Sequence, residues 1–527
     1  MWWEEEQVVA IISCSVLLFF VIRRAEVKHC ILWFRNDLRI HDNAIFHHPS
    51  VKAAERVTPV YIFDPRHFKD TDFGSSRKTG GFRAQFIRES VNDLRSSLKS
   101  LGSDLSMFVD KPEDVLQKLA GPQSIVICQE EVTSEELNVD KAVSKGLHKV
   151  DSKLVKVWGP TLYHPDDLPF SMDNLPEPFT VMRNTLEKRA KVEVRELLPD
   201  PKLPAANQAD GSLKDVPSLE ALGFSKEEIS EMQTQDEDKR GVMKFTGGET
   251  KAMERVAHFT KTALKTYKKT RNGLIGESYS SKYSPWLACG CLSPRMIYWK
   301  TREYENAHGG QTVDTYWLIF ELMWRDFFRF YCVKHGDSVF HLSGPKNTRR
   351  AWSRDSKLIN AWKKGQTGIP WVDANMRELL QTGFMSNRGR QNVASYLVHD
   401  LGVDWRYGAD HFESLLLDHD VCSNYGNWVA AAGLTGGRIN RFNMSKQAND
   451  YDKDGRYVKM WCPELKELPS KCVHSPWDLS SSEQSRFGVL IGSDYPAPIR
   501  APKRGYTGGG GGGKDNRPRR NGGGRYK

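Results

Sequence analysis

The first part of the chain alternates short apolar runs with longer amphipathic segments. Five runs have the length of buried strands: HCILWF, RVTPVYIF, DLSMFV, SIVIC and KLVKV. The segments between them, such as GFRAQFIRESVNDLRSSLKSL, place apolar residues near helical spacing. Alternation of strands and helices is typical of a parallel, doubly wound sheet. The sequence therefore predicts a Rossmann-like α/β domain over residues 28–160, although LWFRNDLRIHDN replaces the usual glycine-rich dinucleotide turn after the first strand.

The pattern changes twice after this domain. Residues 161–245 are polar and rich in proline, which predicts an interdomain connection with a few short helices. From residue 246 to about residue 480 helical spacing persists without a convincing run of strands, so we expect a second, all-α domain there. Residues 481–527 end in a Gly- and Arg-rich stretch and are predicted to form a disordered tail.

Residues 1–27 form an apolar N-terminal extension. Its apolar run, residues 8–22, is shorter than the roughly 20 residues that a spanning helix needs. Acidic residues precede the run and an arginine pair follows it, which is the reverse of a secretory signal. We expect an intracellular protein, with the nuclear, cytoplasmic or organellar compartment left open. A membrane anchor with the arginine pair inside remains an alternative to a helix packed on the body or an extension without function.

Charge adds a nucleic-acid partner to this picture. The net charge is +10, and residues 505–527 hold six Lys and Arg against one Asp, which is half of the excess. A basic segment of this kind suits the phosphate backbone of single-stranded DNA or RNA. The nine cysteines have no CxxC pairs and no Cys/His spacing that suits zinc. The sequence therefore predicts free thiols and no metal site.

Polar residues stand among aromatic ones in four segments of the helical region. The loop SSKYS, residues 280–284, combines hydroxyls with a lysine and suits a phosphate, although a helix-capping loop would use the same residues. In ELMWRDFF, Glu321, Trp324 and Arg325 share one helix face, as would an ordinary Glu–Arg pair on a core tryptophan. NRGRQ, residues 387–391, brings two amides and two arginines close to aromatic residues.

The fourth segment, DHDVCSNYGNW, forms a mixed stripe. Asp420, Asn424 and Trp428 stand at i, i+4 and i+8, with Asp418 just upstream. A surface acid pair followed by a core tryptophan is the alternative. Together the four segments suit one site for a large, planar ligand that carries phosphate.

Five motifs resemble the photolyase/cryptochrome family in chain order. They are LWFRNDLRIHDN, SSKYSPWLACGCLSP, ELMWRDFFR, GIPWVDANMRELLQTGFMSNRGRQ and DHDVCSNYGNW. CSNYGNW, MSNRGRQ and FNMSKQANDYDKDGRYVKMW are most similar to its cryptochrome DASH branch. The resemblance covers roughly residues 28–480. It implies a monomer in which an α/β antenna-type domain lies next to a helical FAD-binding domain.

The resemblance also implies roles for the matching residues. FAD would be held by Tyr267, Ser280, Ser281, Lys282, Tyr283, Ser284, Arg325, Asn387, Arg390, Asp418, Asp420 and Asn424. Arg390 would pair with Asp418 beside the flavin ring. Electrons would pass along Trp352, Trp405 and Trp428, and Asn424 would face flavin N5. Glu131 in CQEEV would contact an antenna, methenyltetrahydrofolate, although an acid at a strand end without a ligand is the alternative.

The implied activity is light-driven repair of cyclobutane pyrimidine dimers, preferentially in single-stranded DNA. The DNA pocket would be lined by Glu321, Trp324, Asn387, Arg388 and Gln391. The chain departs from the pattern at Ala430, where family members usually carry an aromatic residue, and at LTGGRINR, residues 434–441, which replaces the usual Gly-Asn-Asp-Pro-Arg. A blue-light photoreceptor that signals through a protein or nucleic-acid partner without repair therefore stands as the second hypothesis.

Overall fold

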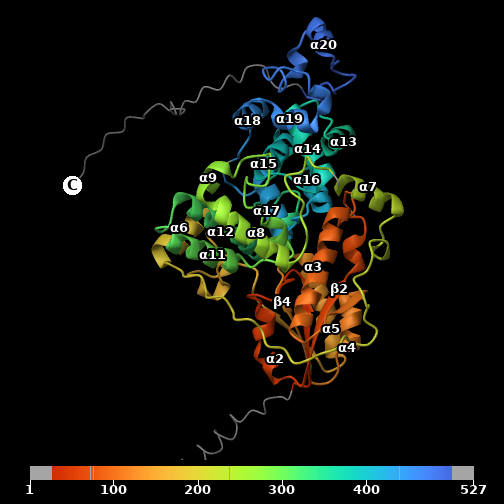
Figure 1. Cartoon of the computed structure of the whole chain (residues 1–527), viewed down its shortest axis with the longest axis vertical. Helices are drawn as coiled ribbons and strands as arrows, with labels where there is room; N and C mark the ends of the chain where they lie inside the picture. The colour runs from red at the N-terminus through yellow and green to blue at the C-terminus, as the bar shows by residue number, and fades with distance from the viewer. Residues whose placement is uncertain (1–26, 72, 75, 237, 438, 501–527) are drawn as a thin grey trace, which may run out of the picture.

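The computed structural model describes residues 27–500 apart from 72, 75, 237 and 438, and it has a sheet domain and a helical domain (Figure 1). The sheet is parallel, with strand order β3-β2-β1-β4-β5. Its strands are β1 (His29–Phe34), β2 (Arg56–Phe63), β3 (Ser106–Val109), β4 (Ser124–Gln129) and β5 (Lys153–Val157). These strands are the five predicted apolar runs, so the α/β prediction is confirmed.

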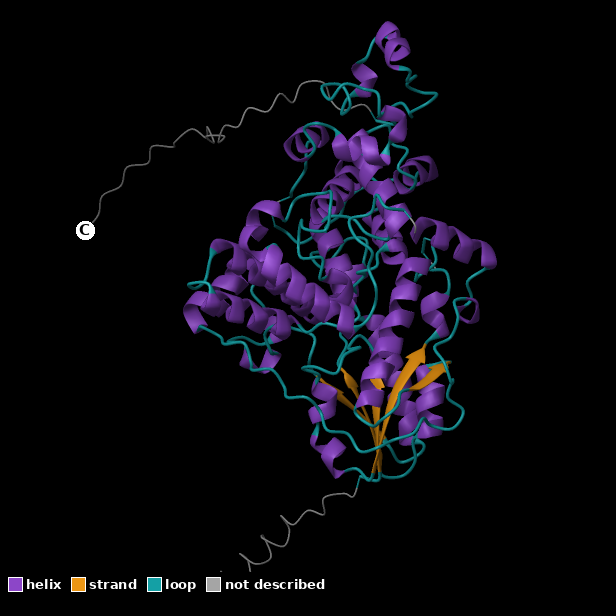
Figure 2. Cartoon of the chain, in the orientation of Figure 1, coloured by secondary structure: helices purple, strands orange, loops and turns teal. Residues whose placement is uncertain are grey.

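The order of the strands reverses between β1 and β4, which are neighbours in the sheet. Figure 2 shows the strand arrows pointing toward the helical domain. Ligands of doubly wound sheets bind beyond the carboxyl ends of the strands at this point of reversal. The loops after β1 and β4 therefore meet the helical domain at the place where the fold favours a ligand. The crossover helices are α2 (Pro49–Ala53), α3 (Gly81–Ser100), α4 (Pro112–Leu119) and α5 (Ser134–His148).

The connection, residues 161–245, is mostly irregular and includes the helices α6 (Phe179–Asn184) and α7 (Lys226–Asp236). The helical domain follows it (Figure 2). Its first helices are α8 (Glu249–Thr262), α9 (Tyr267–Thr270), α10 (Ser284–Ala288), α11 (Pro294–Ala307), α12 (Val313–His335) and α13 (Ser356–Lys363). The later ones are α14 (Pro370–Thr382), α15 (Asn387–Ser395), α16 (Trp405–Leu415), α17 (Val421–Ala431), α18 (Met444–Tyr451) and α19 (Arg456–Trp461). The predicted all-α domain is confirmed.

Helix α12 packs closely against α17. The long helix α12 begins at a capping box, in which Thr312 and Thr315 satisfy each other's backbone N–H groups. On the facing helix, a Cβ at Gly426 would lie 2.4 Å from a ring carbon of Phe328. Because only glycine leaves room for that ring, the two helices approach closely, and the first turn of α17 lies beside the polar face of α12.

Residues 481–500 are ordered, so the predicted disordered tail is wrong over this range. Helix α20 (Ser481–Phe487) begins at a capping box, and the hydroxyl of the buried Tyr495 donates to Asp373 at 2.5 Å. The backbone N–H of Ile499 donates to the carbonyl oxygen of Thr367 at 2.9 Å. The segment has no helical or strand periodicity, and contacts with the α14 region hold it instead.

The rest of that tail, including residues 505–527, and residues 1–26 lie outside the described residues. The predictions made for the basic stretch and for the apolar run are therefore not addressed by the structure. Among the helices of residues 27–500, none combines the length and the apolar character needed to cross a membrane.

Tyr495→Phe should lower the free energy of unfolding by about 1–2 kcal/mol, because a buried carboxylate oxygen loses a hydrogen bond. Urea unfolding followed by tryptophan fluorescence measures the change. Tyr279→Phe is the control, since Tyr279 is exposed. Equal effects of the two variants would show that residues 488–500 contribute nothing through this contact.

Candidate functional site

Helices α15, α16 and α17 surround a cavity of about 160 Å³. Seven of its lining residues are predicted site residues: Asn387, Arg390, Gln391, Asp418, Asp420, Asn424 and Trp428. The others are Ala394, Phe412, Leu416, His419, Ser423, Asn427 and Ala431. The cavity thus brings together the third and fourth polar segments of the sequence.

An ion pair between a partly exposed arginine and a buried aspartate stands in the wall of this cavity. Arg390 Nη2 lies 2.8 Å from Asp418 Oδ2, and the Asp418 side chain is 2% exposed. Arg390 Nε also donates to the carbonyl oxygen of Met385 at 2.8 Å, which fixes the guanidinium. Asp418 Oδ1 is buried without a hydrogen-bond partner among the described residues. That oxygen is an acceptor that a ligand donor can use.

Asp420 and Asn424 are held at the start of α17. Asp420 is the N-cap, and its Oδ1 accepts from the backbone N–H of Ser423 at 2.7 Å. Burial raises the pKa of Asp420, but the charges of Arg325 and Arg329 and the hydrogen bonds from Ser423 outweigh it and lower the pKa. The side-chain nitrogen of Asn424 donates to the carbonyl oxygen of Ala409 at 3.0 Å. Its side-chain oxygen therefore remains as the acceptor for a ligand.

The three predicted tryptophans come from segments that meet at α16. Trp428 packs on Gly408, where a Cβ would lie 2.1 Å from the indole, and Gly408 is three residues after Trp405. The buried Trp405 donates from Nε1 to the carbonyl oxygen of Leu342 at 3.2 Å. Trp352 is half-buried, and the next residue, Ser353, pairs with the backbone just before Trp405. The fold therefore gathers all three around one helix.

The 280–284 loop reaches the cavity wall through one aromatic ring. Ser280 and Lys282 have φ values of 65° and 61°, the left-handed region, so the loop is tightly turned. Burial lowers the pKa of Lys282 to about 8. Its ammonium lies 5.3 Å from the centroid of Phe384, and the Arg390 guanidinium lies 5.6 Å from the same centroid. Loop and cavity are therefore neighbours.

The other residues of this loop have structural partners. The carbonyl oxygen of Ser281 accepts from Arg255 at 2.9 Å, and Ser284 begins α10. Tyr267 and Tyr283 are both buried, with their ring centroids 5.7 Å and 5.5 Å from that of Phe259. None of them lines the α15–α17 cavity.

The polar face of α12 lies apart from the cavity lining. Arg325 donates to the carbonyl oxygens of Pro160 and Leu287. The carboxylate of Glu321 forms an ion pair with Arg271, and burial raises its pKa although Arg271 opposes that shift. The ring of Trp324 is stacked by Phe179 of α6, with centroids 3.7 Å apart and an interplanar angle of 14°. Glu321 and Trp324 thus have protein partners in this structure.

The start of α15 supplies the predicted mouth residues. Asn387 and Gln391 are exposed and also line the cavity. Arg388 donates to Gln391 Oε1 at 2.9 Å and to Asn272 Oδ1 at 3.3 Å, and its guanidinium lies 4.7 Å from the ring centroid of Tyr451. An amide, a cation and an aromatic ring are therefore presented at the entrance.

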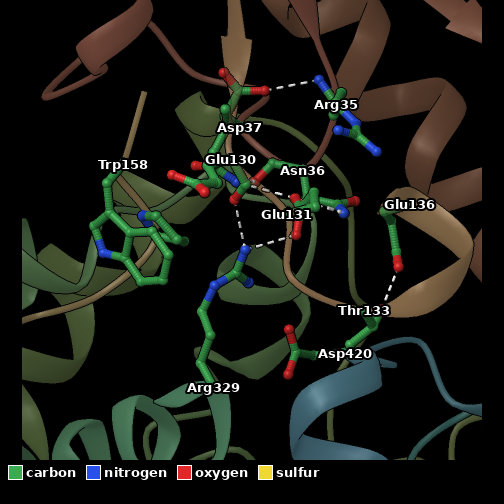
Figure 3. Close-up of polar contacts among 12 residues, drawn as sticks. Arg35, Asn36, Asp37, Glu130, Glu131, Thr133, Glu136, Trp158, Arg329 and Asp420 are labelled. Carbon is green, nitrogen blue, oxygen red and sulfur yellow. Dashed lines mark hydrogen bonds and ion pairs between the residues drawn. The ribbon is translucent and has the colours of Figure 1, made fainter. Parts of the chain in front are cut away.

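Glu131 lies at the domain boundary, beyond the carboxyl end of β4 (Figure 3). It is buried, and its carboxylate accepts from Arg329 at 2.6 Å, from Asn36 at 3.2 Å and from Gln129 at 3.3 Å. Burial raises its pKa, but the charges of Arg329 and Arg35 and the hydrogen bonds from Arg329 and Asn36 outweigh this and lower the pKa. The carboxylate therefore stays ionised at the point where the sheet reverses its strand order.

Four residues of these sites were missed by the sequence reasoning. Arg271 is four residues after Tyr267, and Arg329 is four residues after Arg325, so helical spacing from a predicted residue could have found both. Phe179 and Trp362, whose ring centroid lies 6.1 Å from that of Trp428, carried no sequence signal. Within the described ranges no cluster of metal-ligating side chains occurs.

Comparison with known proteins defines the class. Residues 30–205 match the family profile of DNA photolyase, and residues 317–506 match that of the FAD binding domain of DNA photolyase. Fold and site thus define a two-domain, FAD-binding protein of the photolyase type. Cryptochrome DASH of Danio rerio is 46% identical over 482 residues, which are 89% of this chain and 89% of the relative. Cryptochrome DASH of Gloeobacter violaceus is 47% identical over 486 residues, 90% of this chain and 93% of the relative.

Solved structures agree with these relatives. A Synechocystis cryptochrome superposes with a TM-score of 0.83 at 43% identity, covering 90% of this chain and 96% of that chain. A class III photolyase of Agrobacterium tumefaciens superposes with a TM-score of 0.76 at 28% identity, covering 90% and 95%. This chain therefore belongs to the photolyase/cryptochrome family, in its cryptochrome DASH branch.

Glu378→Gln should change how stability depends on pH. Glu378 is buried, and its carboxylate accepts a hydrogen bond from the Tyr457 hydroxyl at 2.6 Å. Burial raises its pKa to about 7, although Tyr457, Lys282 and Arg390 oppose the shift. A raised folded-state pKa gives stability that is present below pH 4.5 and is lost as the pH rises through 7. Wild type should therefore lose about 3 kcal/mol relative to Glu378→Gln over that window.

Urea unfolding at several pH values measures this difference. Glu254→Gln is the control, because that carboxylate is exposed and, among the described residues, pairs with Lys251 on the surface. A constant difference between wild type and Glu378→Gln from pH 4.5 to pH 8 would contradict the raised pKa.

Proposed function

We propose that this protein is a light-driven, FAD-dependent photolyase that splits cyclobutane pyrimidine dimers, preferentially in single-stranded DNA. The observation that carries the proposal is the α15–α17 cavity, in which the Arg390–Asp418 pair, Asp420, Asn424 and Trp428 share one wall. Buried polar atoms of a protein core usually have hydrogen-bond partners, whereas Asp418 Oδ1 has none among the described residues and borders this cavity.

The residues present fit FAD. Asp418 Oδ1, unpaired among the described residues, and the oxygen of Asn424 offer acceptors to the polar edge of a flavin. The cavity volume of about 160 Å³ suits part of a ring system rather than a whole dinucleotide. The phosphates and ribose would therefore lie toward the 280–284 loop and Tyr267, where Lys282 and Arg390 supply positive charge. Asn387 and Arg325 complete the proposed set.

FAD, when bound and excited by light, supplies one-electron chemistry. Trp428 is the proposed first donor, because its indole is the aromatic group of the predicted chain that lines the cavity. Trp405 and Trp352 would return the electron from the surface side through α16. Asn424 would hold its amide oxygen toward the ring, since its nitrogen is committed to Ala409.

The substrate would enter past α15 and α12. The mouth would be lined by Asn387, Arg388 and Gln391. Glu321 would accept a hydrogen bond from the pyrimidine while its carboxylate also keeps the ion pair with Arg271. Trp324 would stack on the dimer. Ala430 provides no ring on α17, and an absent stacking partner costs about 1–3 kcal/mol per base. Unpairing a duplex adds a further cost, so single-stranded DNA is the favoured substrate.

Glu131 is the proposed contact for a methenyltetrahydrofolate antenna. It lies at the reversal of strand order, where doubly wound folds bind ligands, and the ring of Trp158 lies nearby, with the Arg329 guanidinium 5.5 Å from its centroid (Figure 3). We further propose a monomeric protein inside the cell that also binds RNA through the basic stretch at residues 505–527.

A blue-light photoreceptor without repair activity is the second candidate. Two observations favour it. Ala430 supplies no ring, and Phe179 stacks on Trp324, so less aromatic surface is left for a flipped dimer. Both candidates use the same cavity and the same tryptophans, so only a repair assay separates them.

Ala430→Tyr should tighten dimer binding about 5- to 100-fold, because the tyrosine adds a stacking face. Binding titrations in the dark measure this effect, with unirradiated oligonucleotide as the control.

Light should reverse dimers in single-stranded DNA much better than in duplex DNA. Dimer content after illumination measures this difference, with unirradiated oligonucleotide as the control. A fully reduced, flavin-loaded protein that splits no dimers on either substrate would leave the photoreceptor candidate in its place.

Trp428→Phe should cut photoreduction of bound flavin at least tenfold while FAD stays bound, because an apolar ring fills the space but donates electrons poorly. Transient absorption measures the yield, and Trp371→Phe is the control, since Trp371 is a buried tryptophan that does not line the cavity. Equal yields for the two variants would remove Trp428 from the electron path.

A further inference from the structure

Two arginines of α12 stand beside the carboxylate at the start of α17. Arg325 and Arg329 are four residues apart and therefore share one helix face. Their charges are the main influences that keep Asp420 ionised in its buried position. The charge on this part of the cavity wall therefore depends on α12 and not on α17 alone.

Arg329 also reaches across the domain boundary. Its Nη2 donates to Glu131 at 2.6 Å and to the carbonyl oxygen of Glu130 at 2.8 Å. The side chains of Arg329 and Glu131 are 6% and 4% exposed, so water screens this pair poorly. Figure 3 shows the guanidinium pointing at Glu131 while the carboxylate of Asp420 lies on the other side of the boundary, beside the Arg329 side chain.

Glu131 does not use the whole donor capacity of Arg329. A guanidinium has five N–H donors, and the Nε of Arg329 is buried without a hydrogen-bond partner in the described part of the chain. Arg329 therefore pairs with one carboxylate, Glu131 of the sheet domain, and its charge also acts on a second, Asp420 of the helical domain, without a direct ion pair among the described residues. A change at one carboxylate alters the field that the other experiences.

We infer that Arg329 is a positioning residue that couples the two domains electrostatically, so that the charge of Glu131 sets the redox potential of the flavin site. The inference rests on the proposed function, because it needs FAD in the α15–α17 cavity. It has a reciprocal consequence: a ligand that engages Glu131 would shift the flavin potential, and reduction of the flavin would change the affinity for that ligand by the same factor.

Glu131→Gln tests the direction of the coupling. Removing this negative charge leaves Arg329 uncompensated, and a more positive field at Asp420 favours the more electron-rich form of the flavin. At a fixed solution potential the ratio of reduced to oxidised flavin should rise about tenfold, because the lost charge stands in a buried position that water screens poorly. Redox titration of the FAD-loaded protein, without added folate, measures this ratio.

Substitutions at Arg329 test whether this residue couples Glu131 to the flavin site. Arg329→Gln should shift the ratio the opposite way, and Arg329→Lys, which keeps the charge, should stay within about threefold of wild type. The double variant Glu131→Gln with Arg329→Gln has neither charge, so its ratio should lie between those of the single variants. Thermal unfolding recorded in parallel separates loss of fold from loss of coupling.

Asp140→Asn is the matched control. Asp140 is a buried carboxylate of the same domain and pairs with Arg35 at 2.8 Å, as Glu131 pairs with Arg329, but neither Arg329 nor Asp420 is its partner. Its removal should leave the flavin ratio unchanged.

The outcomes separate the coupling from the proposed function. Equal ratios for wild type, Glu131→Gln and Asp140→Asn in flavin-loaded protein overturn the coupling and leave the flavin function intact. A protein that takes up no flavin overturns both. If Arg329→Gln fails to fold, the comparison of Glu131→Gln with Asp140→Asn still decides.

Discussion

A helix that starts with buried carboxylates can form only if positive charge is placed around its first turn. Helix α17 meets this constraint twice, because Asp418 pairs with Arg390 and Asp420 lies near Arg325 and Arg329. The backbone N–H groups of the first turn add a favourable dipole for the same charges. Without Arg325 and Arg329, burial would favour the protonated form of Asp420, and without Arg390 the buried carboxylate of Asp418 would lose its ion pair. The position of α12 and α15 around α17 follows from this requirement.

The same constraint explains why the two domains share their buried charges. Glu131 comes from the sheet domain, but its main partner, Arg329, comes from α12. Asp42 and Arg295 repeat the arrangement with an ion pair of 2.6 Å whose side chains are 0% and 10% exposed. In both pairs a buried carboxylate of the sheet domain is neutralised by an arginine of the helical domain. The interface between the two domains therefore contains buried ion pairs as well as apolar contacts.

The sheet was predictable from sequence because its strands are short runs of buried apolar residues, and the parallel order follows from their alternation with helices. The resemblance to known motifs identified Asp418, Asp420, Asn424 and Trp428 as a group, and all four line the same cavity. It also implied the pair of Arg390 with Asp418, which the structure contains at 2.8 Å. Spacing alone could not have shown that pair, because the two residues are 28 apart in the chain.

Other contacts were beyond reach of the sequence for the same reason. The partner of Glu131 lies 198 residues away, and that of Glu321 lies 50 residues away. The segment at residues 488–500 has no periodicity that predicts structure, and long-range contacts hold it, among them the hydrogen bond of Tyr495 with Asp373 across 122 residues. Local patterns predict elements, whereas long-range charge pairs and single aromatic anchors depend on how the elements assemble.

The ion pairs between the domains also affect whether either domain would be stable without the other. A sheet domain released at the connection would expose Glu131 and Asp42 without their arginines, and the helical domain would keep Arg329 and Arg295 without their carboxylates. Separation would thus break both ion pairs and would also expose to water the apolar surface that the domains bury against each other. The two domains are therefore separate in architecture but one unit in folding, and cleavage of the 161–245 connection would leave a nicked complex rather than two free fragments.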